Sequence, residues 1–238
     1  MYPGTVQPQS PTPLGSWGTG AEHGDQQAQF MQRVLANFGF SLLIAAGGAY
    51  AGWSLPPAAY LGLILVEFVL LMAAMFVRRS ATASPFLVYA FAAVSGATTV
   101  PLIKWAIGYT QGTAVVYNAL GATGAIFCAM SWYGMTTKRD LSGWGTFLMM
   151  GLIGACIASF IGLFITHTPV YQLMISAVVT IVMTGFIGYD INQVKRNWQA
   201  YDVNVATLTL YIDFLNLFVH LLRIMAMLSG GGSSRDWE

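Results

Sequence analysis

Four ionisable residues interrupt stretches that otherwise suit the interior of a membrane: Glu67, Asp190, Asp213 and Arg223. A charge at the centre of a membrane-spanning helix costs at least about 2.5–3.5 kcal/mol, so such residues usually mark a function. Three are carboxylates, and two carboxylates close together repel unless they share a proton. Carboxylate oxygens are also the ligands that calcium prefers. These residue types indicate proton or cation handling inside a membrane.

A polar seam follows the last apolar segment. Thr209, Asp213, Asn216, His220 and Arg223 recur at alternating intervals of four and three. This spacing keeps them on one face of a helix. We expect the face to point into a helix bundle, with Asn216 and His220 as secondary pore-lining residues. For His220, a hydrogen-bonded core histidine is the simpler interpretation.

The expected depths group these charges into two sets. Arg78 and Asp190 close their segments at one end, and Asp213 enters from that end, so we expect these three to meet near that end. The rise of an α-helix places Glu67 about 16 Å beyond Arg78, and Arg223 about 15 Å beyond Asp213. Similar depth predicts a Glu67–Arg223 pair, and a structural ion pair explains it at least as well as a pore-lining one.

Composition requires that these segments lie in lipid. Hydrophobic residues make up 56% and charged residues 8% of the 238 residues, against about 25% charged in soluble domains. The net charge of +1 does not favour nucleic acid as a partner. No zinc-protease, serine-hydrolase or phosphate-loop motif occurs, so we expect no enzyme and no cofactor. Cys128 and Cys156 lie in apolar runs, which argues against a disulfide framework.

Seven apolar runs of helical length predict an all-α integral membrane protein, because about 20 residues cross a bilayer. The runs are 38–53 (reaching back to about 34), 58–77, 86–103, 114–135, 144–165, 170–191 and 205–228. We expect a mobile tail over 1–32, a transmembrane domain over 33–228 and a short tail over 229–238. Small-residue stripes at Gly121, Gly124 and Ala125, and at Gly154, Ala158 and Gly162, predict close helix packing.

Basic residues predict the orientation, since they accumulate in cytoplasmic loops. With seven spans, one side receives Arg33, Arg78, Arg79, Lys138, Arg139, Lys195 and Arg196. The other side receives only Lys104 and Arg235. We therefore expect a cytoplasmic N-terminus and an external C-terminus.

Three stretches resemble the Bax-inhibitor family of seven-helix membrane proteins, especially its bacterial inner-membrane members: SWYGMTTKRDLSGWG, GYDINQVK and LTLYIDFLNLFVHLLRIM. The likeness runs from about 33 to 228. It implies a pH-sensitive calcium leak channel whose seventh helix is central and wrapped by the other six. Asp190 and Asp213 would share a proton, gate the pore with the help of Arg78, and hold calcium transiently. Glu67 and Arg223 would form an inner pair. Ile191-Asn192 and His220 depart from the common family pattern.

The resemblance leaves the physiological role open. The implied partners are calcium as the permeating ion and the lipid bilayer. A second hypothesis is a non-conducting regulatory protein that binds other membrane proteins, such as a membrane protease. A third is a proton-coupled transporter, which would show proton flux that depends on a substrate.

Overall fold

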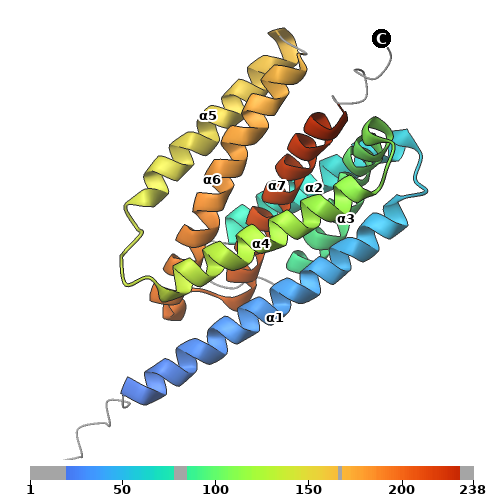
Figure 1. Cartoon of the computed structure of the whole chain (residues 1–238). Helices are drawn as coiled ribbons and strands as arrows, with labels where there is room; N and C mark the ends of the chain where they lie inside the picture. The colour runs from blue at the N-terminus through green and yellow to red at the C-terminus, as the bar shows by residue number, and fades with distance from the viewer. Residues whose placement is uncertain (1–19, 78–84, 166–167, 231–238) are drawn as a thin grey trace, which may run out of the picture.

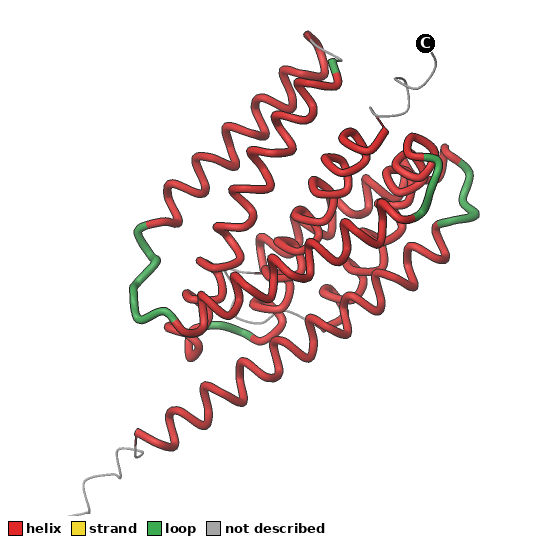
Figure 2. The backbone as a smooth tube through the Cα atoms, in the orientation of Figure 1, coloured by secondary structure: helices red, strands yellow, loops and turns green. Residues whose placement is uncertain are grey.

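Seven α-helices make up almost all of the computed structural model, which describes residues 20–77, 85–165 and 168–230. Short loops and one 3-10 turn, η1 (Trp198–Ala200), join the helices (Figure 2). No strand occurs in these three ranges, so the all-α class is confirmed. The helices are α1 (Gly20–Gly52), α2 (Pro57–Val77), α3 (Pro85–Thr110), α4 (Ala114–Thr136), α5 (Trp144–Ile165), α6 (Pro169–Arg196) and α7 (Val203–Gly230).

Six of these helices are long and apolar enough to cross a membrane, namely α1 and α3 to α7. The apolar stretch of α2, Pro57–Ala73, is shorter than those of the other six. A protein with six such helices is a multi-pass membrane protein. The seventh crossing that the sequence predicts depends on α2.

The most buried of the six is α7, which packs against α1, α3, α4 and α6. Figure 1 shows it in red, with α6 on one side and α3 and α4 on the other. The main contacts of α2 are with α3, and those of α5 are with α6. Four helices are therefore the principal neighbours of α7, and α2 and α5 lie outside them.

An aromatic cluster joins three of these helices beside α7. The rings of Phe38 (α1) and Phe127 (α4) stack with centroids 4.6 Å apart. Phe214 of α7 meets both rings edge-on, at 5.7 Å and 5.6 Å. Offset and edge-to-face contacts of this kind stabilise a core beyond the area that they bury. Leu210 and Leu217, fully buried, extend the same core along α7.

The first helix begins earlier than expected. Residues 20–32, predicted to belong to the tail, form the start of α1, and residues 1–19 lie outside the described ranges. Gln27 Nε2 donates a hydrogen bond to the Lys195 carbonyl at 2.7 Å, and Phe30 lies 6.2 Å from Trp198, centroid to centroid. Met31 is 4% exposed. These contacts with the end of α6 and with η1 hold the segment in helical form. Of the predicted C-terminal tail, Ser229 and Gly230 belong to α7, and 231–238 lie outside the described ranges.

Close helix packing occurs at only part of the expected positions. A side chain at Gly162 would overlap the ring of Tyr171 on α6, whose hydroxyl donates to the Ala158 carbonyl at 2.6 Å, so the stripe of α5 packs closely there. Side chains built at Gly121, Gly124 and Gly154 would meet nothing within 4 Å, so these positions do not bring helices together. Side chains at Gly48 and Gly96 would overlap the backbone of the facing helix. The closest backbone approach through glycines is therefore between α1 and α3.

Candidate functional site

The polar seam of α7 is turned away from lipid, as predicted, where it enters the bundle. Thr209 is 7% exposed and Asp213 is 6% exposed, while Asn216, His220 and Arg223 are half-buried. Most of the other positions of the helix are apolar, chiefly Leu, Val, Ile, Met, Ala and Phe. Thr209 and Asn216 return hydrogen bonds to their own helix, to Val205 O at 3.0 Å and Ile212 O at 2.9 Å. The chemistry of the seam therefore depends on its ionisable members, Asp213, His220 and Arg223.

The two aspartates lie on neighbouring helices. Asp190 is half-buried near the end of α6, and Asp213 is buried on α7. These two helices pack against each other. Arg78, the expected third member of the gate, lies outside the described residues. A proton shared between the aspartates therefore stays a prediction.

Glu67 has a different partner from the one predicted. Its Oε2 accepts a hydrogen bond from Thr98 Oγ1 at 2.6 Å, and the structure shows no ion pair between Glu67 and Arg223, both of which are described. Thr98 belongs to α3, the helix on which α2 packs. The structure thus links Glu67 to α3, and a direct pair with Arg223 is not observed.

A hydrogen-bonded chain continues from Glu67 towards α7. Thr98 Oγ1 also lies 3.0 Å from the Ser95 carbonyl, and Ser95 Oγ lies 2.6 Å from the hydroxyl of Tyr211. Ser95 is fully buried and Tyr211 is 1% exposed. Buried polar groups require such partners, because each unsatisfied one is costly. The chain connects α2, α3 and α7 in the middle of the bundle, and sequence reasoning missed it because serine and threonine are common in packed helices.

His220 and Arg223 form the far end of the seam. The two residues are three apart on α7 and therefore project from one face. His220 Nδ1 is buried, with no hydrogen-bond partner among the described residues. The ring therefore does not have the bond at Nδ1 expected of a hydrogen-bonded core histidine.

No group of three or more His, Cys, Asp or Glu side chains that suits a metal ion occurs within the described ranges. Calcium takes six to eight oxygen ligands in proteins. Transient calcium binding by Asp190 and Asp213 stays a prediction.

The end of α6 holds the loop between α4 and α5. Asn192 is fully buried. Its Oδ1 accepts a hydrogen bond from the Leu141 amide at 3.2 Å, and its Nδ2 donates to the carbonyls of Gly134 at 3.4 Å and Arg139 at 3.3 Å. One amide side chain thereby satisfies one backbone group at the end of α4 and two in the loop that follows it. Asn192 therefore holds the α4–α5 loop against α6, two residues after Asp190.

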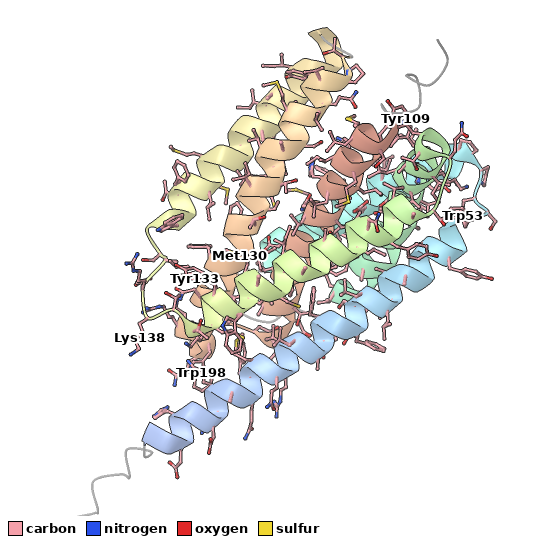
Figure 3. The ribbon with its side chains drawn as sticks, viewed as in Figure 1. Trp53, Tyr109, Met130, Tyr133, Lys138 and Trp198 are labelled. Atoms are coloured by element: carbon pink, nitrogen blue, oxygen red, sulfur yellow. The ribbon has the colours of Figure 1, made fainter. Side chains whose placement is uncertain are left out.

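Basic residues of the same turn strengthen this contact. Lys195 Nζ donates to the Met135 carbonyl, and Arg196 Nη2 donates to the Lys138 carbonyl at 2.6 Å. Lys138 and Trp198 lie at this end of the molecule (Figure 3). Hydrogen bonds from the Ser142 amide and hydroxyl, helped by Arg196, lower the pKa of Asp140 in the loop. Lys195 and Arg196, which predict the cytoplasmic side, therefore also hold the loop in place.

Replacement of Asn192 by leucine should destabilise the protein. The change leaves the Leu141 amide and two carbonyls unpaired in a buried place, at about 1–3 kcal/mol for each orphaned group. We expect a lower midpoint of thermal unfolding for the purified protein in detergent. Asn118→Leu, at an exposed position on α4, is the matched control. Equal midpoints for the two variants would contradict the role of Asn192.

Helix lengths and the buried Asp213 on α7, the most buried of the six candidate spans, together define a multi-pass membrane protein with an ionisable interior. Residues 27–230 match the family model described as "Inhibitor of apoptosis-promoting Bax1". The chain therefore belongs to the Bax inhibitor family.

Curated bacterial proteins resemble the chain over most of its length. A protein of Helicobacter pylori strain J99 is 32% identical over 211 residues, covering 87% of this chain and 90% of that protein. A membrane protein of Streptococcus pyogenes serotype M3 is 36% identical over 178 residues, or 71% and 74% of the two chains. The inner membrane protein YbhL of Escherichia coli K12 is 34% identical over 176 residues, or 69% and 73%. Membrane residence is thus common to this chain and the relatives so described.

Proposed function

We propose that the protein is a pH-sensitive calcium leak channel of a bacterial inner membrane. The observation that supports it is the burial of Asp213 on α7, against the helix that carries Asp190. A carboxylate buried in a membrane-spanning helix is costly, so it usually marks a function. In the proposed mechanism α7 is the central helix, and the aspartate pair shares a proton when the channel is closed. At higher pH both ionise, repel, and one turns towards Arg78.

Calcium flux into liposomes tests the proposal. The full chain is reconstituted with a calcium-sensitive dye inside the vesicles, and calcium is added outside at several pH values. We expect influx that increases from acidic to neutral pH, with protein-free vesicles as the control. Proton flux that requires a solute substrate would instead identify a proton-coupled transporter.

The rival proposal is a non-conducting regulatory protein that binds other membrane proteins, for example a membrane protease. Vesicles that take up no calcium at any pH would support this function.

The orientation is a further proposal, with the N-terminus in the cytoplasm and α2 as the seventh crossing. We expect a cysteine at Ser142 to react only from the cytoplasm and one at Thr168 only from outside. The background should replace Cys128 and Cys156, both exposed on the helices. Impermeant maleimide applied to intact cells and to inverted vesicles makes the measurement. Labelling of both positions from one side would contradict the topology.

A further inference from the structure

A groove opens between α1 and α4, with α3 and α7 as its floor. It encloses a cavity of about 530 Å³, within the usual range for ligand sites. Its walls include Ala46, Ala49, Gly96, Tyr117, Leu120 and Phe218. The small side chains of Ala46 and Ala49 on α1 leave this space open along one wall.

The groove opens to the surroundings of the helices. On its α4 rim, Tyr117 is 69% exposed and Leu120 is 43% exposed, and Ala46 is exposed on the α1 rim. In a membrane, exposed apolar side chains on a crossing helix face hydrocarbon. The occupant must therefore enter from the bilayer.

The polar atoms in the floor are already satisfied. Tyr211, which lines the groove, uses its hydroxyl in the bond with Ser95, and Thr99 Oγ1 donates to the Ser95 carbonyl at 2.7 Å. Water would need two to four polar partners to remain there. The remaining surface offers contact without hydrogen bonds, which suits an alkyl chain.

One end of the groove reaches a cationic and aromatic cluster. Ile103 lines the groove and is followed by Lys104, which is exposed. Lys104 Nζ donates to the Trp53 carbonyl at 2.6 Å and lies 5.2 Å from the centroid of the Trp53 ring. Trp105 and Tyr109 stack on the same part of α3. Trp53 and Tyr109 lie at the same end of the molecule (Figure 3), and such residues mark the membrane–water interface.

We propose that this groove binds an anionic phospholipid from the leaflet at the Trp53 end. One acyl chain lies between α1 and α4, and the phosphate lies near Lys104, which has two further donors. Since lipid tails are already in an apolar phase, selectivity comes from packing in the groove and from the head group. The site is independent of whether the protein conducts calcium.

Photocrosslinking tests the acyl-chain site. The full chain is placed in nanodiscs of phosphatidylethanolamine and phosphatidylglycerol, with a trace of phosphatidylglycerol carrying a diazirine on one acyl chain. We expect crosslinks to gather in peptides covering 42–49, 116–120 and 211–218. Ala46→Leu, which fills the groove, should lose most of them. Ala51→Leu on the same helix, exposed and outside the lining, should keep them.

Lys104→Gln tests the head group. Crosslinking by the phosphatidylglycerol probe should decrease about fivefold relative to a phosphatidylethanolamine probe, as one basic residue near a membrane surface allows, and Lys104→Arg should restore it. Equal thermal midpoints for the variants show that they fold. Crosslinks spread evenly over all lipid-facing helices, and unchanged in Ala46→Leu, would overturn the proposal. Crosslinks between copies through 116–120 would also overturn it, since a second chain would then occupy the groove.

Discussion

Alanine at Gly48 should destabilise the helix bundle by about 1–3 kcal/mol, the usual cost of overpacking. A methyl group there would overlap the carbonyl oxygen of Ala93 on α3, and one at Gly96 would overlap the carbonyl oxygen of Ala45 on α1. The two glycines, one on each helix, therefore allow the backbones of α1 and α3 to touch. Neither carbonyl is the end of a flexible side chain, so the helices themselves must separate. The measurement is the midpoint of thermal unfolding in detergent.

The adjacent residue is the matched control for this prediction. A side chain at Gly47 would meet nothing within 4 Å. Gly47→Ala removes the same conformational freedom and adds the same methyl group, so it should leave the midpoint unchanged or raise it. If Gly48→Ala unfolds at the same temperature as Gly47→Ala, the close contact between α1 and α3 is wrong.

These glycines also show what the sequence predicts well and what it does not. Apolar runs identified the helices, because length and hydropathy are local properties of each segment. A stripe of small residues shows that a helix is able to approach another closely. It carries no information about which helix stands opposite. Gly162 of the predicted stripes does meet Tyr171 of α6. Gly121, Gly124 and Gly154 have open space before them, while Gly48 and Gly96 make the backbone contact.

In the candidate site too, the sequence predicted local features of one helix better than contacts between helices. The seam of α7 followed from the helical period, and its burial at Thr209 and Asp213 agrees with that. The Glu67–Arg223 pair rested on depth alone, which leaves the direction around each helix axis undetermined. Because α2 packs mainly on α3, Glu67 meets Thr98.

The hydrogen bonds of Asn192 are a contact that the sequence does not predict. Its partners are backbone groups at the end of α4 and in the following loop, about 50 residues away in sequence. Backbone groups look alike at every position, so no residue pattern marks them. Such a contact becomes visible only when the folded chain brings α6 and the loop together.

Asparagine at Asp213 or at Asp190 should flatten the pH dependence of calcium flux. This prediction rests on the proposed channel function. Two carboxylates that share a proton titrate as a pair and not as separate groups. An asparagine in either place removes the shared proton, so the closed arrangement no longer depends on pH. One linked proton changes the open population by at most about tenfold per pH unit, and we expect most of that slope to disappear.

The control is Asp25→Asn, the same substitution at an exposed position near the start of α1. It should keep the slope of the unmodified protein. Equal amounts of folded protein in the vesicles, checked by thermal midpoint, separate gating from loss of the fold. Each aspartate variant should conduct either at every pH or at none, depending on which arrangement the asparagine favours. In both cases we expect a flux that does not change with pH.

A conducting protein whose slope survives in both variants would refute the aspartate sensor. Its pH response would then have to come from another titratable group of the seam, and His220, half-buried three residues from Arg223, would be the next position to substitute.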